Sequence, residues 1–155
     1  MKDVDTTLTN LLCFNAYSLH RAFGRYYQAA FGETGLTYPK FVILMVLDAS
    51  GPLTVSEVSA LAGVEPNTLS PLLKKMASFD LITRTRAQED ERRVVLEIAD
   101  KGRTVLERAR GVVLQGFAAL GLDPIAVEQA VTFMQEAREA VEAADPPRLN
   151  LDDLT

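Results

Sequence analysis

The sequence predicts a mainly α-helical fold with a small β-hairpin wing, which is a winged helix-turn-helix flanked by N- and C-terminal helices. Two short helical patterns separated by a glycine, a pair of strand patterns and long helical patterns on both sides predict it. Such flanking helices need a packing partner, and a second copy of the chain suits that role. We expect residues 1–38 and 104–145 to form a helical dimerisation region, residues 39–103 the winged lobe, and residues 146–155 a tail.

The N-terminal arm is predicted to be one long helix. Asp5 can cap it, and apolar residues recur at helical spacing as far as Phe31. The glycines of "FGETG" end this helix, and Pro39 suits the first turn of the next one. The nearly all-apolar run "PKFVILMVLDA" predicts that this second helix is buried on most sides.

Two short helices follow. Thr54 and Glu57 fit a capping box, which predicts a helix from about Val55 to Ala62. Gly63 breaks that helix and Pro66 suits the start of the next. The apolar stripe of the second short helix is expected to be Leu69, Leu72, Leu73 and Met76.

A hairpin and two longer helices complete the prediction. "LITRTR" and "RRVVLEI" read as two strands, with the polar segment "AQEDE" as the tip between them. Asp100 can then cap a helix to about Leu120, and Asp123 with Pro124 starts a final helix to about Ala144.

Composition excludes several classes of protein. The longest apolar run, "FVILMVL", is far too short to span a bilayer, and "MKDVDTTLTN" has no apolar signal region. We therefore expect a cytoplasmic protein with no membrane partner. One cysteine and one histidine cannot form a structural zinc cluster, so neither a metal nor another cofactor is expected.

The charge distribution points to DNA. Residues 72–93 hold six basic and four acidic side chains, a net charge of +2 within a chain of net charge −5. These basic groups lie on the second short helix and the hairpin, where DNA phosphates would lie in a winged motif. A solvated surface is the other reading of these charges. We expect double-stranded DNA to contact the following residues: Asn67, Thr68, Ser70, Lys74, Lys75, Arg84 and Arg86.

The segment "FDLITRTRAQEDERRVVLEIADKG" resembles the wing and following helix of the MarR family of winged-helix regulators. "DER", Asp90 to Arg92, matches the family's aspartate-x-arginine wing motif. The resemblance implies that Arg92 enters a minor groove while Asp90 braces it. It also implies a homodimeric transcriptional repressor, not an enzyme, that binds a near-palindromic operator.

The single cysteine, Cys13, opens a second question. Taken alone, such a residue is more often a small buried hydrophobe than a reactive group. His20 follows seven residues later, about 10 Å along a straight helix, which is too far for direct proton transfer in a cysteine hydrolase.

The pair "LCFNAY" and "LTYP" is similar to the OhrR-like, organic-hydroperoxide-responsive branch of the MarR family, of the one-cysteine type. The resemblance implies that Cys13 is a peroxide sensor whose sulfur is hydrogen-bonded by Tyr27 and Tyr38, with Tyr17 lining the same pocket. The inducer would be an organic hydroperoxide. Oxidised Cys13 would then react with a low-molecular-weight thiol, cyclise to a sulfenamide or over-oxidise. Lys40 departs from the branch, which more often has a glutamine there.

Helix geometry adds a constraint. Tyr27 follows Cys13 by fourteen residues, about 21 Å along one straight helix. If the two side chains meet, Tyr27 comes from the partner subunit, across an interface of antiparallel first helices, and Tyr38 comes with it.

Three alternatives remain open. The first is a MarR-type repressor released by a non-covalent aromatic or phenolic ligand, with Cys13 structural. The second is a thiol peroxidase, and the third is a protein-interaction module that uses the winged fold without DNA.

Overall fold

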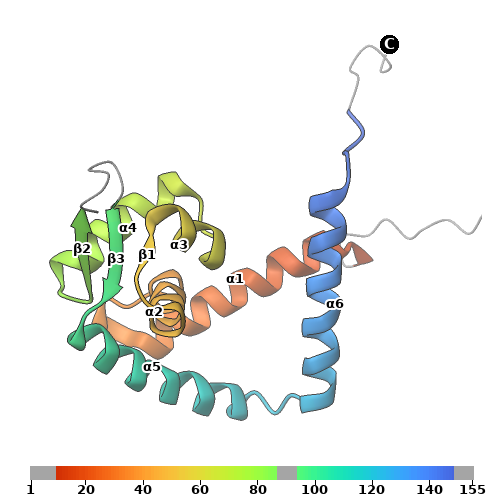
Figure 1. The fold of residues 1–155 in the computed structure, drawn as a ribbon. Coiled ribbons are helices and arrows are strands. Elements are labelled where there is room, and N and C mark those ends of the chain that lie inside the picture. The colour runs from red at the N-terminus through yellow and green to blue at the C-terminus, as the bar shows by residue number, and fades with distance from the viewer. Residues whose placement is uncertain (1–9, 87–93, 149–155) are drawn as a thin grey trace, which may run out of the picture. The chain divides into compact units, whose positions relative to one another are not determined.

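The computed structural model describes residues 10–86 and 94–148, and it confirms the predicted fold class of helices with a small antiparallel sheet (Figure 1). The predicted hairpin tip, with Asp90 and Arg92, lies outside the described residues. The chain divides into two units, residues 1–116 and 117–155. The elements are α1 Leu12–Phe31, the short 3₁₀ helix η2 Gly32–Thr34, α2 Tyr38–Ser50, β1 Leu53–Thr54, α3 Val55–Ala62, α4 Pro66–Ser78, β2 Ile82–Arg86, β3 Val94–Ile98, α5 Asp100–Ala119 and α6 Pro124–Ala143.

Helix α2 forms the centre of the first unit (Figure 1). Ile43, Leu44 and Leu47 are fully buried, as the apolar run predicts, and they pack with buried residues of α3, α4, the strands and α5. Pro39 lies in the first turn of α2, and Gly51 ends the helix with a φ of 76°. The core of the lobe is therefore built around one almost wholly apolar helix.

The sheet has three antiparallel strands in the order β1-β3-β2. The predicted hairpin is confirmed in its paired part, which runs from Ile82 opposite Ile98 to Arg86 opposite Val94. Strand β1 was not predicted; its Leu53 pairs with Leu96 of β3. This third strand connects the N-terminus of α3 to β3 at the base of the wing.

The helix-turn-helix follows its local signals closely. The Thr54 hydroxyl accepts a hydrogen bond from the Glu57 N–H at 3.3 Å, and the Glu57 carboxylate accepts one from the Thr54 N–H at 2.7 Å. Both halves of the capping box are therefore formed. Gly63 ends α3 in the left-handed region, with a φ of 62°, and the Ser59 hydroxyl donates to the Val64 carbonyl at 2.7 Å across the turn.

Two helix starts differ from the predictions. Leu11 is extended, with φ −83° and ψ 122°, so α1 begins at Leu12. The prediction of one continuous helix from Asp5 is therefore wrong at its N-terminal end. Asp5 itself lies outside the described residues. Asp100 lies in the first turn of α5 and is not its cap. The predicted cap of α6 is confirmed, since the Asp123 carboxylate accepts from the Ile125 N–H at 3.3 Å.

Across the described ranges, no single helix is long and apolar enough to cross a membrane. Helices α5 and α6 reach the required length and apolarity only as a broken pair, by length and composition alone.

Gly102 allows α5 to approach the start of β2 closely. A Cβ there would overlap the Leu81 carbonyl oxygen and lie 3.0 Å from Cγ1 of Ile98. We expect Gly102→Ala to destabilise the fold by about 1–3 kcal/mol, because overpacking outweighs the gain in helix propensity. Gly111→Ala in the same helix meets nothing within 4 Å and is expected to stabilise the fold by about 0.5–1 kcal/mol.

Urea unfolding of the two variants and the wild type measures both effects. Equal stability of Gly102→Ala and the wild type would contradict the close approach of α5 to β2.

Candidate nucleic-acid interface

Helix α4 presents a polar surface opposite its buried stripe. Leu69, Leu73 and Met76 are buried, as predicted, whereas Asn67, Thr68 and Ser70 are exposed at the N-terminal end. Glu65 precedes the helix and makes no side-chain capping hydrogen bond. The N-terminus of a helix is electrostatically positive, so these short polar side chains stand where an anion is favoured.

Basic side chains extend this surface in two directions. Lys74 and Lys75 are exposed on the later turns of α4, and Arg84 and Arg86 are exposed on β2. Residues two apart on a strand share a face, so the two arginines project from the same side of the wing. Within the described ranges, no salt bridge involves any of these four side chains.

Cys13 lies at the other region that the sequence singled out, the start of α1. It is exposed in the first turn of the helix, so the expectation of a buried thiol from residue type alone is wrong. Tyr17 lies one turn later and is 58% exposed, with the Arg21 guanidinium 5.6 Å from its ring centroid. His20 is exposed as well.

Tyr27 and Tyr38 form an aromatic pair near the end of α1. Their ring centroids are 4.8 Å apart and the two rings are nearly parallel. Phe31 stacks on Tyr27 with a centroid distance of 5.7 Å. Tyr27 is buried, whereas Tyr38 is 41% exposed. Burial raises the pKa of the Tyr27 hydroxyl, and the neighbouring Tyr38 and Tyr26 raise this pKa further.

The unbroken helix from Leu12 to Phe31 separates Cys13 from this pair by about 21 Å within one chain. The structure therefore brings the two tyrosines together and keeps the cysteine of the same chain away from them.

Two helices expose apolar side chains in quantity. Helix α1 buries only Tyr27 and Phe31. Within the second unit, α6 buries no residue. The exposed large apolar residues of these two helices are Leu12, Phe14, Tyr17, Leu19, Ile125, Val131, Phe133, Met134 and Val141. Such surfaces mark sites of protein association.

A cavity of about 340 Å³ lies between the end of α1, the start of α2 and α5. Its walls are mostly apolar, with three basic residues, Lys40, Lys101 and Arg108, and no acidic residue among those that line it. Lys40 is 4% exposed and its ammonium donates to the Gly35 carbonyl. Burial lowers the pKa of Lys40, and the charge of Lys75 lowers this pKa further.

Sequence reasoning did not find this cavity. Its one signal was the lysine inside the apolar run "YPKFVIL", a position at which a charged side chain is rarely buried without a reason. The part of the chain that the structure describes holds no cluster of three or more metal-ligating side chains.

Residues 25–109, more than half of the chain, match the family model described as "Transcriptional regulator SarA/Rot". Over 99 residues the chain is 38% identical to the HTH-type transcriptional regulator MgrA of Staphylococcus aureus. The aligned segment covers 63% of this chain and 67% of MgrA.

Two solved structures share the fold. Reduced AbfR bound to DNA has a TM-score of 0.74 and 24% identity, and the match covers 87% of this chain and 93% of AbfR. PcaV of Streptomyces coelicolor, in complex with its natural ligand, has a TM-score of 0.75 and 22% identity, covering 90% and 98% of the two chains.

We expect Asn67→Ala and Lys74→Ala to affect DNA binding differently. Loss of a base-edge contact at Asn67 should cost about 1–3 kcal/mol and relax the preference at one base position. Loss of a phosphate contact at Lys74 should weaken binding equally on all sequences and reduce the salt slope by about 1.

Fluorescence-anisotropy titrations against a set of single-base operator variants, at several salt concentrations, separate the two effects. Arg138→Ala in α6 is the control for a lost positive charge outside the winged motif. An Asn67→Ala variant with wild-type affinity and sequence preference would remove that residue from the interface.

Proposed function

Since the chain belongs to the SarA/Rot family of winged-helix, MarR-type regulators and is a DNA-binding transcriptional regulator, we propose that it is a homodimeric repressor of the OhrR-like kind. It releases its operator in the cytoplasm when an organic hydroperoxide oxidises Cys13. The observation that carries the proposal is the placement of an exposed thiol at one end of α1 and a tyrosine pair at the other.

Dimerisation is supported by the exposed apolar side chains of α1 and α6. A single chain leaves Leu12 and Phe14 beside Cys13 in solvent. A second copy would cover these side chains and remove the cost of exposing them.

The sensor site is assembled by that dimer. If the first helices of two subunits lie antiparallel, the start of one helix meets the end of the other. Cys13 then faces the Tyr27–Tyr38 pair of the partner chain, while Tyr17 of its own chain lines the same space. Phenol hydroxyls that donate to the sulfur favour the thiolate, which is the form that reacts with peroxides.

The chemistry begins with attack of the Cys13 thiolate on one peroxide oxygen. The O–O bond breaks, a sulfenic acid forms on Cys13, and the alkoxide leaves and takes up a proton to become an alcohol. The sequence contains no second cysteine. A low-molecular-weight thiol can then displace hydroxide, which leaves as water, to give a mixed disulfide.

The DNA half of the proposal uses the winged motif. Asn67, Thr68 and Ser70 contact bases or phosphates, and Lys74, Lys75, Arg84 and Arg86 neutralise the backbone. Arg92 enters a minor groove at the wing tip, braced by Asp90. AbfR, which shares the fold, has been solved bound to DNA in both reduced and overoxidised forms.

A DNA-shift titration at fixed salt, with the DNA upstream of the protein's own gene as probe, tests the thiol. We expect the wild type to bind and to lose affinity 5- to 150-fold, as a coupling of about 1–3 kcal/mol dictates, after about one equivalent of an alkyl hydroperoxide per subunit. Cys13→Ser is expected to stay bound. Release of Cys13→Ser by the peroxide would overturn the thiol-sensor proposal.

A mixed dimer tests assembly across the interface. One subunit carries Cys13→Ser, and the other carries Tyr27→Phe with Tyr38→Phe, which preserve the stacked rings. If the partner donates the tyrosines, the remaining Cys13 of this dimer faces an intact pair and reacts at the wild-type rate. A rate as low as that of the double tyrosine variant would place the interaction within one chain and contradict the proposal.

A second candidate function is supported by the cavity. At about 340 Å³ it falls in the range of small-molecule sites, about 300–1,000 Å³, and its basic groups suit a phenolic or other aromatic acid. Such a ligand would release DNA without any change at Cys13. PcaV, which shares the fold, was solved with its natural ligand.

We expect a hydroxybenzoate probe, if this candidate is right, to weaken DNA binding of both the wild type and Cys13→Ser. Lys40→Met with Arg108→Met should reduce the apparent affinity for the probe at least tenfold, a change of about 1.4 kcal/mol, because both cations are lost. Isothermal titration with the free protein measures this. Arg138→Met is the matched control, and an unchanged affinity in the double variant would exclude the cavity.

A further inference from the structure

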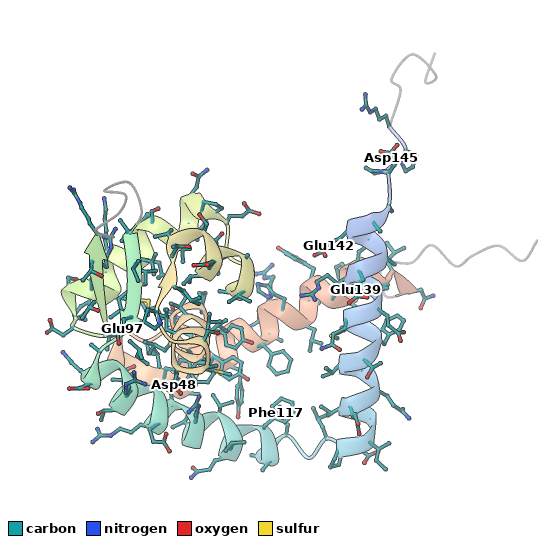
Figure 2. The ribbon with its side chains drawn as sticks, viewed as in Figure 1. Asp48, Glu97, Phe117, Glu139, Glu142 and Asp145 are labelled. Carbon is teal, nitrogen blue, oxygen red and sulfur yellow. The ribbon has the colours of Figure 1, made fainter. Side chains whose placement is uncertain are left out.

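Asp48 links two helices that are far apart in the sequence. Its carboxylate Oδ1 lies 3.0 Å from Nη1 of Arg103, and Oδ2 lies 3.0 Å from Nη2 of Arg110. In Figure 2, Asp48 is labelled between α2, which is seen nearly end-on, and α5, which runs across the view. Arg103 and Arg110 are two helical turns apart on one face of α5. One carboxylate therefore contacts two points about 10 Å apart along that helix. We refer to these three residues as the Asp48 clamp.

The position of Asp48 is electrostatically unfavourable without these partners. It lies in the last turn of α2, where the helix dipole opposes a negative charge. Its side chain is 24% exposed, and those of the arginines are 50% and 41% exposed. Ion pairs at such exposures contribute little to overall stability. Beside the buried core these ion pairs add little to the stability of the lobe, and their geometry favours one orientation of α5 against α2.

The clamp lies along the contact of α5 with the lobe, which continues past it to the partly buried Val113. Ala109 is the last buried residue of α5, and Arg110 follows it directly. At the other side of the clamp, Asp48 follows the fully buried Leu47 at the centre of the core. The clamp therefore joins the fully buried centre of the lobe to α5, most of which falls in the expected dimerisation region of residues 104–145.

We infer that the Asp48 clamp sets the spacing of the two α4 helices in the dimer, one from each subunit, and hence the operator spacing that the protein accepts. This inference rests on the proposed homodimeric function. A rotation of α5 by about 10° relative to α2 displaces a point 13 Å from the pivot by about 2 Å. Two symmetric subunits double this to about 4 Å, which exceeds the step of one base pair, about 3.4 Å.

The test compares operators whose two half-sites are one base pair closer, at the natural spacing, or one base pair further apart. The wild type should prefer one spacing. In Asp48→Asn this preference should fall at least about fivefold, because α5 is no longer held at one angle. A role in stability alone would weaken binding to all spacings equally.

Two variants serve as controls. Glu107→Gln removes the same charge beside Arg110, which it approaches only to 4.0 Å, and leaves α2 untouched. It should keep the wild-type spacing profile, and so should Asp48→Glu, which retains the carboxylate. An Asp48→Asn protein with the wild-type profile would overturn the inference. Failure of the wild type to bind any operator would instead overturn the proposed function, and the inference with it.

A measurement without DNA gives an independent answer. In a Cys13→Ser background, Ser70→Cys places a single exposed cysteine on α4, to which a spin label can be attached. The distance between the two labels of the dimer should be narrowly distributed, and Asp48→Asn should shift or broaden it. An identical distribution in Asp48→Asn would overturn the inference.

Discussion

Burial of α2 is the interaction on which the rest of the DNA-binding lobe depends. Ile43, Leu44 and Leu47 are fully shielded from solvent, and each such side chain contributes about 1.5–3 kcal/mol by burial. Residues of α3, α4, both hairpin strands and α5 pack into the same core. Helix α4 and the wing are thus fixed relative to one another, because both are anchored on one apolar helix. The polar surface of α4 can then act as a rigid unit.

The long helix α1, unlike α2, leaves most of its apolar side chains exposed in the single chain. An isolated helix of 20 residues has little stability in water unless its apolar face is covered, and α1 buries only its last turns. In the proposed dimer, the contact that stabilises the arm is also the contact that brings Cys13 to its tyrosines. A change at the thiol then acts directly on the interface that holds the two lobes at their working distance.

Local signals in the sequence predicted most of the fold, whereas contacts between residues far apart in the sequence could not be predicted from it. The capping box at Thr54 and the glycine at Gly63 set the bounds of α3, because each acts within four residues. Strand β1 is two residues long, too short for any periodicity, and depends on Leu96 far along the chain. The burial of Lys40 and the approach of Arg103 and Arg110 to Asp48 likewise depend on tertiary packing. For the site, residue types predicted the exposed polar surface of α4 but not the stacking of Tyr27 on Tyr38.

In the proposed dimer, control by spacing explains how a site outside the winged motif can govern DNA binding. Neither the thiol at the start of α1 nor the cavity near its end includes a residue of the polar surface on α4. Because the lobe packs as one core around α2, a signal does not need to deform α4 to weaken binding. In the proposed dimer it needs only to change the angle between α5 and the lobe in each subunit. Simultaneous contact with both half-sites is sensitive to shifts of a few ångströms, so a modest coupling energy suffices to empty the operator.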